Sequence, residues 1–145
     1  DSEEETEESD VEEFMTFDRL GEKELKKAKE FLPGLYVPTY IPEGYELEQL
    51  KIEKYYSGDY LCDYAYNSED RIIKILLYYS MDSERSNQWP EDGELIEMSD
   101  RKIFVTEDSV SGEPWVSVYT ETCNIDISGS SEKDQLIEIG KRMTK

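Results

Sequence analysis

Apolar and polar residues alternate along several short stretches of the chain, which is the pattern of strands that bury one face of a β-sheet. Ile125 and Ile127, for example, alternate with Asn124 and Asp126. Clusters of Gly, Ser, Asn and Asp separate these stretches and indicate tight turns. Short strands that follow one another in this way predict an antiparallel meander of six or seven strands. The segments predicted to be strands are 46–56, 60–66, 71–79, 94–98, 102–106, 114–120 and 123–128.

The segment 71–79 differs from the other predicted strands because it is apolar on both of its faces. Only Lys74 interrupts the apolar run from Ile72 to Tyr79. Strands that are covered on both faces have such runs. We therefore expect 71–79 to be the central strand of the sheet.

Two other segments repeat apolar residues at the spacing of a helix. Leu25, Ala28 and Leu32 mark one face of 18–32, with Phe31 beside them, and glutamates and lysines supply the opposite face. Near the other end of the chain, 131–134 reads as a capping box, and apolar residues recur at helical spacing after it. The whole pattern predicts an α+β fold in which a curved antiparallel sheet is flanked by an N-terminal and a C-terminal helix.

The charge of the chain is large and unevenly distributed. Its 145 residues include 36 Asp and Glu, 16 Lys and Arg and no histidine, for a formal net charge of −20. Nine of the acids lie in 1–13, where there is no basic residue. Such a segment cannot offset its ordering entropy, so we expect 1–16 to be a disordered acidic tail or linker and 17–145 to be a single α+β domain. The acidic balance also excludes nucleic acid as a partner, because phosphate backbones would be repelled.

The residue types argue against catalysis and against a metal or an organic cofactor. Without histidine the chain lacks the commonest general base and any Ser-His or Cys-His pair. Cys62 and Cys123 lack the spacing of a zinc or redox site, and we expect two buried, reduced thiols, with a disulfide as the alternative. A hydrolase that uses carboxylates alone is a further alternative, although acidic residues are too numerous for any pair to stand out.

The segment 38–45 is the most distinctive local motif. Its two prolines exclude a helix and favour extended backbone, and Pro42-Glu43-Gly44 is typical of a tight turn. We interpret it as a rigid corner with a structural or a recognition role. The motif residues are Pro38, Tyr40, Pro42, Glu43, Gly44 and Tyr45.

The eleven tyrosines raise the question of a binding surface. Several of them lie in consecutive predicted strands and should be neighbours on a sheet face. Tyrosine also forms strands readily and packs its ring into cores, and we favour this structural interpretation. The candidate ligand face, if the tyrosines are left open to solvent, consists of Tyr60, Tyr64 and Tyr66.

The segment 38–45 also resembles the opening motif of a family of uncharacterised extracytoplasmic domains of Gram-positive membrane proteins and lipoproteins. That motif is a Pro-x-Tyr-Leu-Pro-Glu-Gly-Tyr-like segment that follows a short helix and precedes a β-meander. The family's closing strand, Ser-Gly turn and helix are similar to 125–143 here, so the resemblance covers about residues 20–145. Some members resemble the sensor halves of anti-sigma-factor-like proteins, and others are anchored lipoproteins. The resemblance implies no catalytic residues.

From these observations we expect a non-catalytic extracytoplasmic sensor or interaction domain of a membrane-anchored Gram-positive protein. The alternative is a carbohydrate- or peptide-binding module of a surface lipoprotein. We expect a monomer whose partner is a protein or a cell-wall ligand, and which meets the membrane only through a tether outside this chain.

Overall fold

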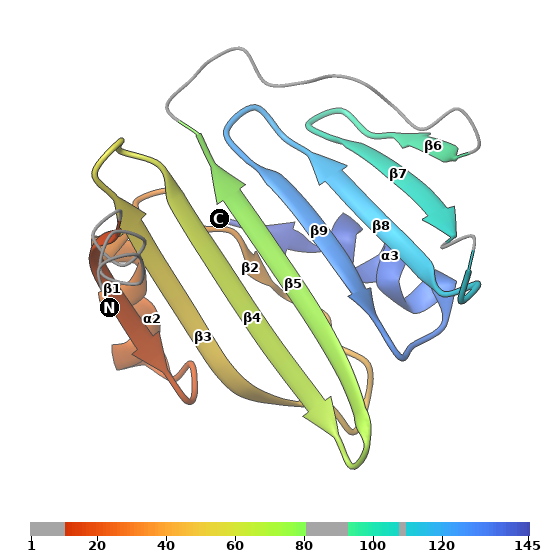
Figure 1. Ribbon diagram of the computed structural model, residues 1–145, viewed down its shortest axis with the longest axis horizontal. Helices are drawn as coiled ribbons and strands as arrows, with labels where there is room; N and C mark the ends of the chain where they lie inside the picture. The colour runs from red at the N-terminus through yellow and green to blue at the C-terminus, as the bar shows by residue number, and fades with distance from the viewer. Residues whose placement is uncertain (1–10, 81–92, 108–109) are drawn as a thin grey trace, which may run out of the picture.

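A computed structural model describes residues 11–80, 93–107 and 110–145 (Figure 1). Eight strands form one antiparallel sheet, and two very short strands form a second one. The strands are β1 (Val11–Phe17), β2 (Val37–Pro38), β3 (Glu46–Tyr55), β4 (Tyr60–Ser68), β5 (Arg71–Tyr79), β6 (Glu94–Glu97), β7 (Lys102–Glu107), β8 (Pro114–Tyr119), β9 (Asn124–Gly129) and β10 (Met143–Thr144). The helices are α2 (Glu22–Phe31) and α3 (Lys133–Lys141).

The predicted α+β class is confirmed, and each of the seven predicted strands corresponds to one of β3 to β9. The large sheet has eight strands rather than six or seven, in the order β1-β3-β4-β5-β9-β8-β7-β6. This order contains two meanders, because the chain leaves β5, builds β6 at the far edge and returns strand by strand to β9. The prediction of one meander in chain order was therefore wrong at the junction, where β5 pairs with β9.

The eighth strand is β1, and it corrects the predicted boundary of the acidic tail. Residues 11–16 were assigned to that tail, but Val11–Phe17 pairs with β3 at the edge of the sheet. Backbone hydrogen bonds to β3 and an ion pair between Glu12 and Lys54, 3.7 Å apart, accompany this pairing. Met15 and Phe17 are partly buried on the core side. The rest of the predicted tail, 1–10, lies outside the described residues.

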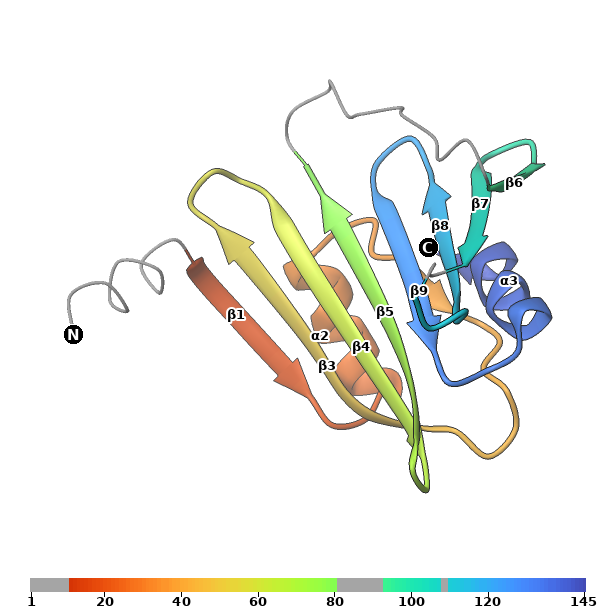
Figure 2. The same ribbon diagram turned by 45° about the vertical axis from the view of Figure 1, so that its right-hand side comes forward.

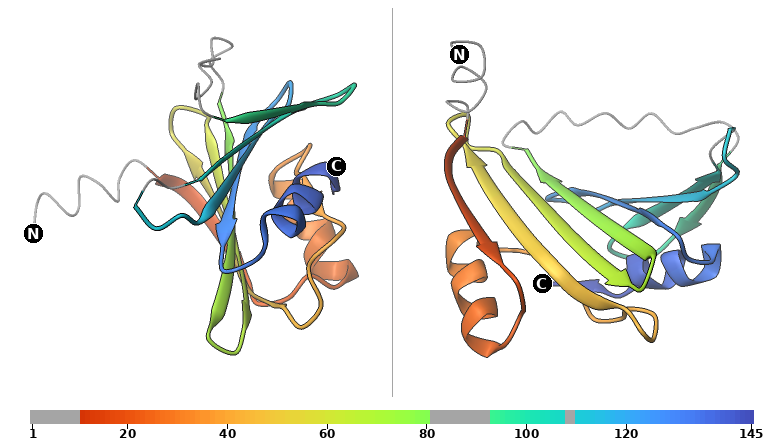
Figure 3. Two further views of the ribbon diagram at one scale, coloured as in Figure 1. Left: turned by 90° about the vertical axis from the view of Figure 1, so that its right-hand side faces the viewer. Right: turned by 60° about the horizontal axis from the view of Figure 1, so that its bottom comes forward.

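Both helices lie on the same side of the twisted sheet, α2 behind β1 and β3, and α3 behind β7, β8 and β9 (Figures 2 and 3). The core fills the space between this side of the sheet and the helices, and every other residue of each central strand points into it. In β5 these residues are Ile73, Ile75 and Leu77, all fully buried. Neither α2 nor α3, the helices of the described residues, covers the opposite side of β5. The central position of β5 is thus confirmed, whereas coverage of both its faces is not.

The helices begin later than their sequence signals suggested. The predicted segment 18–32 becomes a helix only at Glu22, because the four preceding residues make the connection from β1 and Gly21 is the N-cap. At α3 the capping box is formed by Glu132 and Gln135, one residue beyond the predicted one.

Cys62 and Cys123 are both buried and form no disulfide bond with each other, as expected. The reason differs from the one that a single meander provides. Cys62 lies on β4 and Cys123 directly precedes β9, so that only β5 separates them. Two strand spacings amount to about 9.6 Å, whereas a disulfide needs Cα atoms within about 7 Å.

The corner at 38–45 folds as predicted. The amide of Tyr45 donates to the carbonyl of Pro42 at 3.3 Å and closes a tight turn. Gly44 has φ of 93°, a conformation that side chains with a Cβ rarely adopt. Pro42 is buried, whereas Glu43 and Gly44 are exposed. The glycine is therefore required by the backbone and not by space.

We predict that Gly44→Val destabilises the domain by about 1–3 kcal/mol, because valine would be forced into a left-handed conformation. Glu43→Val, in the same exposed turn but without positive φ, is the matched control and should cost much less. Chemical denaturation of both variants measures the difference. Equal effects would show that the turn does not depend on the conformation of Gly44.

We also predict two reactive thiols per chain under denaturing, non-reducing conditions. In the native state the same reagent should react slowly, because burial raises the pKa of the Cys62 thiol and hides both sulfur atoms. A count of zero thiols after denaturation would contradict the pairing of β5 with β9, which holds the two residues too far apart.

Candidate functional site

The corner motif is docked against the C-terminal part of the domain. Thr39 donates its amide and its hydroxyl to the carbonyl of Arg142, at 3.0 and 2.7 Å. The hydroxyl of Tyr45 donates to the carbonyl of Ser130 at 3.3 Å, and β2 pairs with β10. The opening and closing segments that carried the family resemblance thus contact each other in the fold. All six predicted motif residues are in one corner, and the contacts of Tyr45 and Pro38 there are structural.

A close backbone approach accounts for the glycine of the closing segment. Gly129 ends β9 opposite Ile73, and a Cβ on it would lie 2.3 Å from the carbonyl oxygen of Ile72. Real Cβ atoms do not approach a carbonyl oxygen so closely. The Ser-Gly pair at 128–129 is therefore needed for the packing of β9 against β5.

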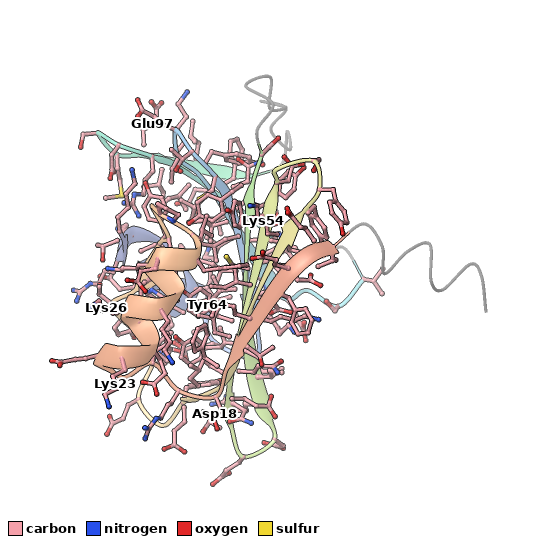
Figure 4. All side chains as sticks on the ribbon, turned by 90° about the vertical axis from the view of Figure 1, so that its left-hand side faces the viewer. Asp18, Lys23, Lys26, Lys54, Tyr64 and Glu97 are labelled. Carbon is pink, nitrogen blue, oxygen red and sulfur yellow. The ribbon has the colours of Figure 1, made fainter. Side chains whose placement is uncertain are left out.

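The tyrosines proposed as a candidate ligand face point toward the helices, and that prediction was wrong. Tyr64 is fully buried and Tyr66 is 8% exposed. Figure 4 shows Tyr64 between α2 and the sheet. Tyr60 is partly buried and packs edge-on against Phe31, with ring centroids 6.0 Å apart. The structural interpretation of these tyrosines, which the sequence pattern favoured, is the correct one.

Two buried tyrosine hydroxyls hold the segment after α2 onto the sheet. Tyr64 donates to the carbonyl of Tyr36 at 2.9 Å. The hydroxyl of Tyr79 accepts from the amide of Tyr36 at 2.8 Å and donates to the carbonyl of Gly34 at 3.2 Å. Each bond satisfies a backbone group in a region that β-sheet pairing does not reach.

Neither α2 nor α3 covers the other side of the sheet, and we call this side the open face. Its side chains alternate with the buried ones along each strand. We consider the open face on six neighbouring strands of the sheet, β1, β3, β4, β5, β9 and β8. Its residues there are Phe14, Thr16, Gln49, Lys51, Glu53, Tyr55, Leu61, Asp63, Ala65, Asn67, Ile72, Lys74, Leu76, Tyr78, Asn124, Asp126, Ser128, Trp115, Ser117 and Tyr119.

Large apolar side chains are exposed on the open face. Phe14 is 63% exposed at the β1 edge, Trp115 is 44% exposed, and Ile72 and Tyr78 are each 41% exposed. Trp115 on β8 is paired with Ser128 on β9, and Ser128 is paired with Lys74 on β5, so that the three residues lie in one line across the sheet. Single exposed apolar side chains are common on protein surfaces, so it is their placement on one helix-free face that makes this face the candidate interaction surface.

The charged side chains at the centre of the open face neutralise one another. Lys74 contacts Asp63 at 3.2 Å, and Lys51 lies 3.5 Å from Glu53. Lys51 also lies 5.7 Å from the ring centroid of Phe14. With Asp126, two lysines and three carboxylates give the centre of the face a net charge of −1, which is small beside the −20 of the whole chain.

Two carboxylates on the open face accept hydrogen bonds, and one of them retains an unused oxygen. Asp126 accepts from the hydroxyl of Ser117 at 2.9 Å. Asp63 uses Oδ2 for Lys74, whereas its Oδ1 is shielded from solvent and has no hydrogen-bond partner. An unsatisfied carboxylate oxygen is costly, and a donor brought by a ligand would satisfy it.

A hollow of about 450 Å³ lies beside Arg101, but its polar groups have structural tasks. The Arg101 guanidinium binds both oxygens of Asp100, at 3.0 and 2.8 Å, and donates to the carbonyls of Gly140 and Met143. The hydrogen bonds from Arg101 are the main reason why the pKa of Asp100 lies below its usual value. The arginine caps the end of α3 and is neutralised where it sits, so the hollow does not have the charge of an anion site.

Chemistry-bearing groups do not assemble elsewhere in the part of the chain that the structure describes. No three acidic or cysteine side chains there are placed to hold a metal ion. Neither α2 nor α3 is long and apolar enough to cross a membrane. No protein-family model matches the chain, and no curated protein sequence matches it significantly.

Sequence reasoning did not select the residues of the open face. Trp115, Ile72 and Tyr78 occupy the strand phase opposite to the most regular apolar positions. A signal was present, because 71–79 is apolar in both phases. We interpreted the apolar residues on both sides of 71–79 as a sign that both faces of the strand are covered. In the fold one side is buried, and the side with Ile72 and Tyr78 is exposed.

We predict that the buried tyrosines make the domain sensitive to alkali. Burial raises the pKa of Tyr66 to about 12, and it raises the pKa values of Tyr64 and Tyr79 as well. Tyrosine in the unfolded chain ionises near pH 10, so above that pH the unfolded state loses protons that the folded state retains. The free energy of unfolding should begin to fall above about pH 8, where the Cys62 thiol ionises in the unfolded chain but not in its buried site, and should fall more steeply from pH 10 toward 12.

Denaturation at stepwise increasing pH measures this dependence, and Tyr79→Phe is the informative variant. It should cost about 1–3 kcal/mol at neutral pH, because the amide of Tyr36 loses its acceptor, and its stability should fall less steeply above pH 10. Tyr56→Phe, at a 69% exposed position, is the control and should behave like the wild type. A wild-type stability that is flat up to pH 12 would contradict the burial of these hydroxyls.

Proposed function

We propose that this chain is a non-catalytic extracytoplasmic binding domain, a sensor or interaction module that recognises a ligand of the cell envelope on its open face. The observation that carries the proposal is the exposure of Trp115, Ile72 and Tyr78 on a sheet face that no helix covers. The alternative, a carbohydrate- or peptide-binding module of a surface lipoprotein, would use the same face.

A binding role fits the chemistry of the described residues better than a catalytic one. Most of the buried polar groups serve the fold, as in the contacts of Tyr64, Tyr79 and Arg101. The carboxylates of the open face are paired with lysines or hydroxyls, which does not favour a proton donor with a raised pKa.

The extracytoplasmic location rests on the resemblance of the segment 38–45 to the family described above. In the fold this segment contacts the closing segment through Thr39 and Tyr45. The proposal includes a membrane tether outside this chain and a monomeric domain. Nucleic acid is not among the partners, since the chain is strongly acidic.

The test is co-sedimentation of the purified domain with cell envelopes isolated from a Gram-positive bacterium. Wild type should sediment with the envelopes, and Trp115→Thr should reduce the bound fraction at least fivefold, because a large stacking surface is lost from the open face. Threonine keeps the preference for a strand. Tyr56→Thr removes an aromatic ring of comparable exposure from a turn and should bind like the wild type.

Equal sedimentation of wild type and Trp115→Thr would remove the open face from the proposal. Failure of the wild type to sediment at all would contradict an envelope ligand. Thermal unfolding of each variant shows that any loss of binding occurs in a folded domain.

A further inference from the structure

We infer that the ligand of the open face is a neutral polysaccharide, held by stacking on Trp115 and Tyr78 and by hydrogen bonds to the polar residues between them. This inference rests on the proposed function and names the chemical class of its ligand. The two rings lie at opposite ends of the face. Trp115 lies level with Lys74 across β9, and Tyr78 is four residues further along β5 than Lys74. Four residues along a strand and two strand spacings across the sheet place the two rings about 16 Å apart.

The charge of the open face favours a neutral ligand. Lys74 with Asp63 and Lys51 with Glu53 cancel within pairs, and Asp126, which accepts from Ser117, leaves the centre of the face with one negative charge. That charge disfavours an anion, and a single charge in contact with water attracts a cation only weakly. The remainder of the chain is strongly acidic and repels a polyanion. An uncharged polymer is not repelled by this charge.

The side chains between the two rings suit a ligand that is rich in hydroxyl groups. Asp126 and Ser128 on β9 lie between Trp115 and the lysine-carboxylate pair of β5 and β4. The unpartnered Oδ1 of Asp63 can accept from a hydroxyl after a small rotation of the side chain. A sugar ring offers C–H groups on its face and hydroxyls at its rim. The electron-rich face of an aromatic ring attracts the former, and fixed acceptors bind the latter.

Macromolecular ligands of other classes fit this face less well. An extended peptide binds a sheet through unpaired backbone groups at an edge, and the backbone groups of the open face are already used in the strand ladders. A folded protein would bury the Lys74–Asp63 and Lys51–Glu53 pairs, and their desolvation is costly. The exposed apolar residues are also separated from one another and do not form the continuous centre of a protein interface.

The experiment is affinity electrophoresis and calorimetry of the whole chain with neutral polysaccharides, namely dextran, laminarin, xylan and galactomannan. Polygalacturonate and heparin serve as anionic controls. We expect binding to at least one of the neutral polymers and to neither polyanion. The affinity should change less than twofold between 0.05 and 0.5 M NaCl, because the ligand carries no charge for salt to screen.

Three variants test the geometry. Trp115→Thr and Tyr78→Thr should each weaken binding at least tenfold, and Asp63→Asn, which replaces one acceptor oxygen by a donor, should weaken it severalfold. Tyr56→Thr should leave the affinity unchanged. Binding that all four variants retain would overturn the assignment to the open face.

The outcomes separate this inference from the function on which it rests. Envelopes stripped of protein by trypsin should still bind the domain through Trp115. If trypsin abolishes binding and no neutral polysaccharide binds, the ligand is a protein, and the inference fails while the binding function stands. If binding to a polymer falls steeply with salt, the ligand is charged, and the inference fails as well.

Discussion

The pairing of β5 with β9 is the interaction on which the rest of the structure depends. It joins a meander built before residue 80 to one built after residue 93, and it converts two half-sheets into one. Ile73, Ile75 and Leu77 meet Ile125 and Ile127 at this junction, and all five side chains are fully buried. Without it β5 and β9 would each be an unpaired edge, and these five apolar side chains would lose part of their cover from water.

Several other features follow from this one junction. It brings α3 to the same side of the sheet as α2, so that a single core forms. It places the corner at 38–45 beside the end of α3, where Thr39 and Tyr45 bond to the chain around it. It also continues the open face from β5 onto β8, and only for this reason do Tyr78 and Trp115 belong to one surface.

The same junction marks the limit of what the sequence could predict. Alternation is local, and it located β3 to β9 because the exposed and buried phases of each strand differ. It does not determine which strands become neighbours, because β5 could pair with β6 or β9 without any change of pattern. It also cannot decide which of two apolar phases meets the helices. Tyr64 and Tyr66 were therefore placed on a ligand face although they are in the core, and Ile72 and Tyr78 were overlooked.

The error at β1 has a different physical origin. The density of acidic residues predicts disorder for a segment taken alone, and in this prediction it outweighed the apolar Val11, Phe14 and Met15. Val11–Phe17 is not alone, because it adds to an existing sheet edge and gains backbone hydrogen bonds that composition does not describe. Phe14 and Lys51, and Glu12 and Lys54, then interact across the two strands. The glutamates of this edge strand have a further consequence, since charged edges discourage pairing with a second copy.

Charge and surface shape are linked through this arrangement. A sheet that exposes Trp115, Tyr78 and Ile72 risks self-association, because apolar faces of two copies attract each other. The net charge of −20 opposes that association, because two copies repel each other at separations within the Debye length. The paired lysines and carboxylates keep the face itself nearly neutral. Repulsion therefore acts between copies of the chain, whereas an uncharged ligand approaches the face without it. A strongly charged body with a nearly neutral face therefore combines an exposed aromatic surface with electrostatic repulsion between copies of the chain.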